Sequence, residues 1–147
     1  MSTTARRLSL AIALLALLGI AVSSVSLDHH FRKSKTSYCD FGESFNCDIV
    51  NRSEYSAIAG IPVALIGILG YAALLAFATF YRAKAETPAI LAVASTGGLG
   101  FALYLTYVEK FILGVWCILC LSSLTVIFTI TILSAFLLIH FIRRDAA

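Results

Sequence analysis

The sequence predicts an all-α membrane protein, a four-transmembrane-helix bundle with one long extracytoplasmic cysteine loop. Hydrophobic residues make up 60% of the 147-residue chain and the mean hydropathy is +0.93, whereas a soluble domain is ~45–50% apolar. Four uncharged runs each reach the ~20 residues that cross a bilayer as a helix. Only one polar segment, 28–56, is longer than the ~2–8 residues that usually join bundle helices. We therefore expect one membrane domain over 1–147.

The uncharged runs extend over 8–27, 55–81, 87–108 and 111–142, and within them we predict spans at 8–27, 57–80, 88–108 and 116–142. The first run follows two arginines, as a signal peptide does. Its length exceeds the ~7–15 residues of a signal h-region, so we expect a retained helix.

Glycine, proline and other small residues stand at positions in the second and third spans that affect how the helices start and pack. Gly60-Ile61-Pro62 opens the second span and predicts a helix start or kink there. The third span is dense in small residues over 94–100, which allow close contact between helices in lipid. Within the polar loop, 47–55 could form a short helix at the membrane surface.

The lysines and arginines place both termini in the cytoplasm. In this orientation the inner basic residues are Arg6, Arg7, Arg82, Lys84, Arg143 and Arg144, and the outer ones are Arg32, Lys33, Lys35, Arg52 and Lys110. The inner six flank the spans in short segments, where the positive-inside rule acts. The net charge of +3 then requires no nucleic-acid partner. We expect a bacterial inner membrane, with every cysteine on its oxidising, extracytoplasmic side.

The four cysteines predict electron transfer. Cys39 and Cys47 lie in the polar loop, and Cys117 and Cys120 form a Cys-x-x-Cys where the last apolar run begins. Such a pair at a helix start can cycle between dithiol and disulfide, and a loop pair can carry electrons to it. If the helix starts near Trp116, Cys117 lies in its first turn, where free N–H groups favour a thiolate. Cys120 then lies one turn deeper on the same face.

Two other interpretations of the cysteines stay open. Free cysteines are commonly buried and inert, so the chain could be a non-catalytic membrane subunit. It could also bind zinc, but seven residues separate Cys39 from Cys47, against the ~2–4 of a usual zinc knuckle. We predict no metal.

Four motifs resemble the vitamin K epoxide reductase family in its bacterial branch. They are the Cys-x7-Cys loop, the stretch 47–55 (CDIVNRSEY), Gly60-Ile61-Pro62 and the late Cys117-Ile118-Leu119-Cys120. The resemblance covers about Leu8 to Ile142. In the functionally analogous DsbB family the Cys-x-x-Cys precedes the looser pair, whereas here the loop pair comes first.

The resemblance implies a bundle that holds a quinone (menaquinone, ubiquinone or phylloquinone) near the outer surface. Cys120 would face the quinone and Cys117 would exchange with the loop. Cys47 would relay to Cys117, and Cys39 would meet an outside partner. Many bacterial members carry a fused thioredoxin-like domain; this chain ends without one, so we expect a separate thioredoxin-like or DsbA-like partner.

The implied function is a membrane thiol–disulfide oxidoreductase that supports disulfide bond formation during oxidative protein folding. The alternative function is that of a quinone or vitamin K epoxide reductase, which would use the same residues. In the first case the physiological product is the disulfide, and in the second it is the reduced quinone.

Several side chains are weaker candidates. Ser53 and Ser56 could donate hydrogen bonds to a quinone carbonyl, although a serine near a helix start more often caps the helix. Tyr71, Tyr104 and Tyr107 could line the pocket, although tyrosines at a membrane interface usually anchor the helix.

Three further positions are predicted not to bind a ligand or to lack an expected side chain. Some family members have a tyrosine four residues after the second active-site cysteine, where this chain has Leu124. His29 and His30 are expected to be exposed and solvated rather than ligating.

Overall fold

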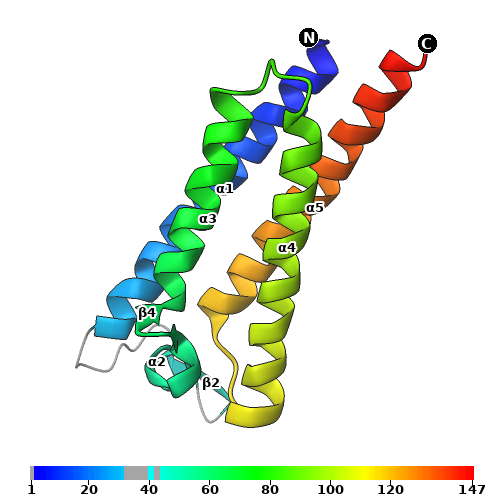
Figure 1. Ribbon diagram of the computed structural model, residues 1–147. Coiled ribbons are helices and arrows are strands. Elements are labelled where there is room, and N and C mark those ends of the chain that lie inside the picture. The colour runs from blue at the N-terminus through cyan, green and yellow to red at the C-terminus, as the bar shows by residue number, and fades with distance from the viewer. Residues whose placement is uncertain (1, 32–39, 42–43) are drawn as a thin grey trace.

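The computed structural model describes residues 2–31, 40–41 and 44–147. Within these residues four long helices lie side by side, and the short elements gather at one end (Figure 1). The long helices are α1 (Thr3–Phe31), α3 (Val63–Thr79), α4 (Thr87–Val108) and α5 (Ile118–Asp145). Both chain ends lie at the end opposite the short elements.

The helices have the length and composition of membrane helices. Thr3–Phe31, Thr87–Leu113 and Ile118–Asp145 are each long and apolar enough to cross a bilayer. Val63–Thr79 is apolar but has 17 residues, which span about 25 Å at ~1.5 Å per residue, against a hydrocarbon core of about 30 Å. The all-α membrane fold is confirmed, and a fourth crossing by α3 stays a prediction.

Two helix boundaries differ from the predicted spans on the side of the polar loop. The first helix continues past residue 27 to Phe31, so the predicted loop starts four residues too early. The second begins at Val63 rather than 57, because β3 (Ala57–Ile58) and β4 (Ile61–Pro62) form a hairpin before it. Ala59 and Gly60 both have positive φ, 53° and 81°, as a tight two-residue hairpin turn requires.

The first helix also begins at Thr3, five residues before its predicted span. The remaining boundaries follow the predictions more closely. The helix start or kink expected near Pro62 is a start, since this residue is the N-cap of α3. The third helix covers the predicted span with one extra residue at its start. The fourth begins at Ile118, two residues later than predicted, and continues three residues beyond 142.

Small residues bring the helices together. α1 packs on α3 and α5, and α4 packs on α5. Gly19 lies under the Tyr71 ring, and Ser23 faces Gly67. In α4 the expected close contact occurs at Gly98, which faces the Ile127 side chain of α5. The core formed around these contacts is apolar and includes Ile12, Ala16, Tyr71, Leu74, Leu91, Ile127 and Ile130.

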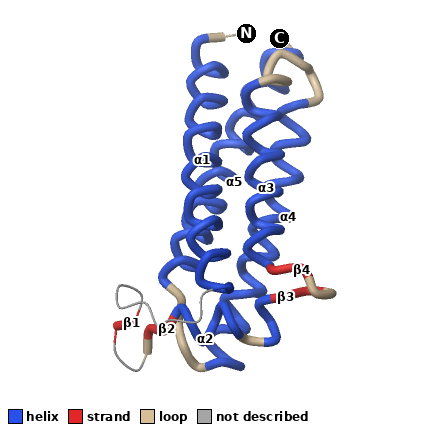
Figure 2. The backbone as a smooth tube through the Cα atoms, turned by 90° about the vertical axis from the view of Figure 1, so that its left-hand side faces the viewer, coloured by secondary structure: helices blue, strands red, loops and turns tan. Residues whose placement is uncertain are grey.

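The short elements cover the end of the bundle away from the termini. They are β1 (Asp40–Phe41), β2 (Phe45–Asn46), α2 (Cys47–Arg52) and η1 (Glu54–Ser56). In Figure 2 the two hairpins lie on opposite sides of α2. The short helix predicted within 47–55 is confirmed as α2, and Asn46 caps it by accepting the Ile49 N–H at 3.1 Å.

We predict that Gly19→Ala destabilises the bundle by about 1–3 kcal/mol, the usual cost of overpacking. A β-carbon at this position would overlap the Tyr71 ring, so α1 and α3 would have to separate. Thermal unfolding in detergent should show a lower melting temperature. Gly100→Ala is the matched control, because nothing lies within 4 Å of its added β-carbon. Equal melting temperatures for the two variants would contradict this account of the α1–α3 contact.

Candidate functional site

The backbone brings a loop cysteine beside the Cys-x-x-Cys. Phe45 in β2 forms a parallel bridge with Trp116, and the Asn46 N–H donates to the Trp116 carbonyl at 3.0 Å. The next residues along the two segments are Cys47 and Cys117. Their side chains are 1% and 0% exposed and belong to one buried apolar cluster. The pairing therefore holds the two cysteines together away from water.

Cys117 precedes the helix instead of lying in its first turn as predicted. It is the N-cap of α5, with extended φ and ψ of −111° and 118°. Cys120 lies in the first turn, and both cysteines are free thiols. Cys47 is disulfide-bonded. Cys39, predicted to meet an outside partner, lies outside the described residues.

The surroundings of Cys117 favour its thiolate. Hydrogen bonds from the Cys120 thiol and from the N–H groups of Cys120 and Leu119 lower the pKa of Cys117, whereas burial and the Glu109 carboxylate oppose this. The favourable groups prevail, and the pKa lies below the ordinary value. The helix-start thiolate expected from the sequence thus has a physical basis at the N-cap position, because the open N–H groups of the first turn point outward there.

A buried acid that the sequence analysis did not consider lies beside these thiols. α4 continues into a π-helical turn, η2 (Glu109–Leu113), and Gly114 follows with φ of 68°. Glu109 is 1% exposed, and its Oε2 accepts the Cys117 N–H at 3.1 Å. Its Oε1 has no hydrogen-bond partner among the described residues. A signal existed in the sequence, since this acid stands next to a predicted span, eight residues before the Cys-x-x-Cys.

Asn51 connects three parts of the site. Its Nδ2 donates to the Cys47 carbonyl at 3.0 Å and lies 3.9 Å from the Cys117 sulfur. Its Oδ1 accepts the Ser26 hydroxyl of α1 at 2.7 Å. Because Asn51 is 6% exposed, these bonds form in a protected environment. Asn51 therefore fixes α2 against both α1 and the Cys-x-x-Cys.

The expectation that His29 and His30 are exposed is wrong. α1 extends through both, so they face the short elements instead of lying in a loop. His29 is 0% exposed, and its Nδ1 lies 3.3 Å from Asp48 Oδ1. His30 Nδ1 donates to the Asn51 carbonyl at 2.6 Å. Both histidines fasten α2 to the end of α1.

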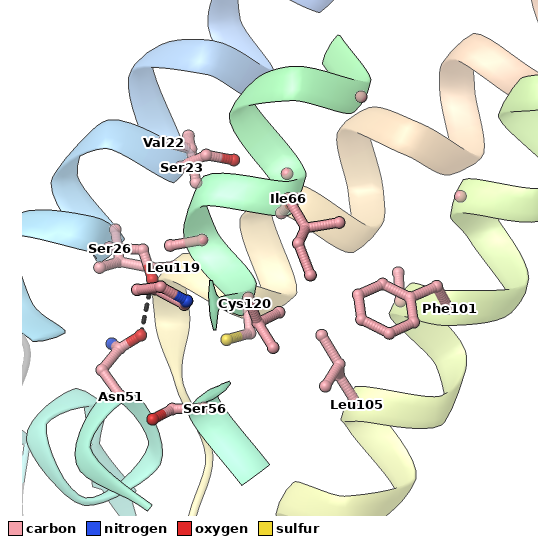
Figure 3. A pocket seen from close by; sticks show the side chains of 18 of the residues that line it. Val22, Ser23, Ser26, Asn51, Ser56, Ile66, Phe101, Leu105, Leu119 and Cys120 are labelled. Carbon is pink, nitrogen blue, oxygen red and sulfur yellow. Dashed lines mark hydrogen bonds between the residues drawn. The ribbon is translucent and has the colours of Figure 1, made fainter. Parts of the chain in front are cut away.

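Cys120, unlike Cys117, opens onto a cavity of about 410 Å³ between the helices. In Figure 3 the polar side chains Ser26, Asn51 and Ser56 lie on one side of Cys120, and the apolar Phe101 and Leu105 lie on the other. The cavity is thus polar at its α2 end and hydrocarbon-like toward α4. A planar carbonyl compound with an apolar tail is suited to both ends.

The predicted serine contacts lie at this cavity, but their hydroxyls already have partners. Ser53 Oγ donates to the Val50 carbonyl at 2.8 Å, and Ser56 Oγ donates to the Ser53 carbonyl at 2.7 Å. Neither bond is an N-cap, since no side chain caps η1. Both serines line the cavity, and their contact with a quinone stays a prediction.

The three tyrosines separate into two groups. Tyr71 lines the cavity and is 5% exposed, with its hydroxyl donating to the Ser123 carbonyl at 3.0 Å. Tyr104 and Tyr107 are more than half exposed and do not line it. Tyr55, which the sequence analysis did not single out, also lines the cavity, whereas Leu124 does not.

The site contains groups suited to thiol chemistry in the part of the chain that the structure describes. No three His, Cys, Asp or Glu side chains there are grouped so as to hold a metal ion. Two thiols, a buried carboxyl and a neighbouring disulfide cysteine instead lie close together, with Cys120 and Glu109 at the wall of the cavity. Such a group can exchange disulfides on one side and reach a bilayer-soluble molecule on the other.

A known protein family matches most of the chain. The model of the Vitamin K epoxide reductase family matches residues 10–135. That segment contains α3, α4, most of α1 and α5, and all four cysteines. A search of curated proteins finds no match.

We predict that Cys120→Ala raises the pKa of Cys117, because the substitution removes the thiol that donates to it. At neutral pH less Cys117 would then be thiolate, and its alkylation would slow. The alkylation rate of Cys117 as a function of pH, read by mass spectrometry, checks this. Cys120→Ser keeps a donor and should leave the titration closer to that of the parent protein. A Cys120→Ala curve that moves to lower pH would contradict the assignment.

Proposed function

The chain belongs to the vitamin K epoxide reductase family, whose members are membrane oxidoreductases, and we propose that it passes electrons from an extracytoplasmic thioredoxin-like protein to a quinone. The disulfide made in that partner would support disulfide bond formation in exported proteins. We place the site at the outer face of a bacterial inner membrane and both termini in the cytoplasm. The position of both chain ends opposite the site is consistent with this topology.

One observation carries the proposal: the two cysteines of the Cys-x-x-Cys face different neighbours. Cys117 is buried against Cys47, and Cys120 lines the cavity. Electrons that enter through the loop can therefore reach Cys117 by disulfide exchange and leave from Cys120. An inert pair of buried cysteines would not need this division.

The loop side acts by thiol–disulfide exchange. The partner's dithiol reduces the disulfide that we assign to Cys39 and Cys47. The Cys47 thiolate then attacks Cys117 of the oxidised Cys117–Cys120 pair and releases Cys120 as a thiolate. Cys39 resolves the Cys47–Cys117 bond, so the loop returns to its disulfide and the Cys-x-x-Cys becomes a dithiol. Each exchange breaks one S–S bond and forms another.

The cavity side fits a quinone. Its volume of about 410 Å³ lies within the ~300–1,000 Å³ of small-molecule sites, and its polar groups gather at the end where the head group would meet Cys120. When bound, a quinone accepts two electrons and two protons. Cys120 and Cys117 supply the two electrons and the two protons as they form their disulfide. Ser53, Ser56 and Tyr55 could orient the ring, the serines by rotating their hydroxyls from backbone carbonyls.

We predict that Cys117→Ala and Cys120→Ala each abolish quinone reduction, because either removes the disulfide at the cavity. Purified protein, a reduced thioredoxin-like carrier and quinone, followed spectroscopically, provide the assay. The Cys39→Ala, Cys47→Ala double variant should lose activity with the protein carrier but keep activity with a small dithiol, because loss of the Cys47 side chain opens the buried Cys117 to it. Full carrier turnover by that double variant would remove the loop from the mechanism.

We predict further that Cys39→Ala traps a Cys47–Cys117 disulfide, since the partner that resolves it is missing. Non-reducing peptide mapping of this variant during turnover should find that bond with Cys120 free. A variant with both Cys39→Ala and Cys120→Ala serves as a second test. It keeps Cys47 and Cys117 but cannot form the competing Cys117–Cys120 disulfide. If mapping shows Cys117–Cys120 intact and Cys47 unpaired throughout turnover, Cys47 is not the relay.

A further inference from the structure

The mechanism above leaves Glu109 without a role, although its position is unusual. A carboxyl group that is 1% exposed beside an apolar cavity has lost its hydration, which is costly unless hydrogen bonds replace the water. Only Oε2 is compensated, by the Cys117 N–H. Oε1 is buried without a hydrogen-bond partner among the described residues. Packing alone would be served better by leucine or methionine.

Two contacts point to the use of this carboxyl. Glu109 lines the same cavity as Cys120, and its carboxyl lies close enough to the Cys120 thiol for each group to affect the protonation of the other. The π turn of η2 and the hydrogen bond to Cys117 hold it there. One oxygen is thus fixed to the backbone of the Cys-x-x-Cys, and the other has no hydrogen-bond partner among the described residues.

We propose that Glu109 is the proton carrier of the site, taking protons from the Cys-x-x-Cys thiols and delivering them to the acceptor in the cavity. This inference rests on the proposed function, because it assumes that the cavity holds the electron acceptor. In this role Glu109 would be a catalytic residue, because it would exchange protons directly with the reacting thiols.

The step balances in electrons and protons. Closing Cys117 and Cys120 to a disulfide forms one S–S bond and releases two electrons and two protons, and a quinone takes up both as it becomes a quinol. The Glu109 carboxylate accepts the Cys120 proton and gives it to a quinone oxygen. The thiolate of Cys117 exchanges with its protonated form, and that form supplies the second proton. Glu109, restored as carboxylate, accepts this proton and delivers it in the same way.

Other titratable groups near the site have different positions. Lys110, the next residue, is exposed and does not line the cavity. His30 lines it but is bound through Nδ1 to the Asn51 carbonyl, and Tyr71 is bound to Ser123. From α2, Asp48 faces His29. Glu109 is therefore the group best placed beside the two thiols.

The test is Glu109→Gln in the full-length protein, with quinol formation followed over a range of pH. Glutamine keeps an oxygen that can accept the Cys117 N–H but cannot carry a proton. We expect the rate to fall by about 100-fold or more, the usual contribution of general acid–base catalysis. The rise in rate between acidic and neutral pH that comes from carboxylate ionisation should also flatten. Glu54→Gln makes the same chemical change at an exposed residue that does not line the cavity, and should preserve rate and profile.

A second measurement reads the carboxyl without quinone. The infrared difference spectrum between the oxidised and dithiol forms should contain a carboxyl band. Only in the dithiol form are there thiol protons for Glu109 to exchange, so its carboxyl differs between the two forms. The band should be absent in Glu109→Gln and present in Glu54→Gln. If Glu109→Gln does not accumulate, Glu109→Asp replaces it and should shift the band.

The outcomes separate this inference from the proposed function. A wild-type rate and pH profile in Glu109→Gln, or a carboxyl band unaffected by substitution of Glu109, overturns the proton role while leaving electron transfer intact. If the wild-type protein reduces no quinone with either dithiol, the proposed function fails. The infrared measurement then decides alone whether Glu109 exchanges a proton with the thiols.

Discussion

The backbone pairing between Phe45 and Trp116 is the contact on which the site depends. It joins two segments 71 positions apart in the chain, and a cysteine follows on each: Cys47 two residues after Phe45, and Cys117 directly after Trp116. A side-chain contact alone would leave such a pair free to separate, whereas the bond from Asn46 to Trp116 fixes their register. The buried cluster around Cys47 and Cys117 then excludes water. Disulfide exchange between the two sulfurs is therefore shielded from solvent.

The bonds that seat α2 show how a six-residue helix can keep a defined place. So short a helix has little stability of its own, and here most of its support comes from α1. His29, His30 and Ser26 all lie on the last turns of α1 and all bond to α2. The late end of α1 at Phe31 is what makes this possible, because a helix that ended at Leu27 would leave the two histidines in a loop.

Sequence patterns predicted what depends on composition and spacing. The four apolar runs, the helix start near Pro62 and the helix within 47–55 follow from local hydrophobicity and from proline chemistry. The histidine contacts and the N-cap position of Cys117 were not predictable in this way, because each depends on a partner far away in the chain. Glu109 was overlooked since charge at the edge of an apolar run usually marks the bilayer surface, and only tertiary packing shows it to be buried. Ser53 and Ser56 line the cavity, as the sequence predicts. Their hydrogen bonds to the Val50 and Ser53 carbonyls were not predicted, because they depend on the local backbone conformation.

The π turn at the end of α4 limits how the chain can change in length. A π turn holds one residue more than the α-helical turn it replaces, and each residue in an α-helix rotates the direction of the next side chain by about 100°. Loss of one residue from Glu109–Leu113 would let α4 continue regularly and would turn the carboxyl away from the Cys-x-x-Cys, even though every side chain with a chemical role remained. Related sequences that use this carboxyl should therefore keep a constant number of residues between it and the first cysteine, while the number in the polar loop is free to vary.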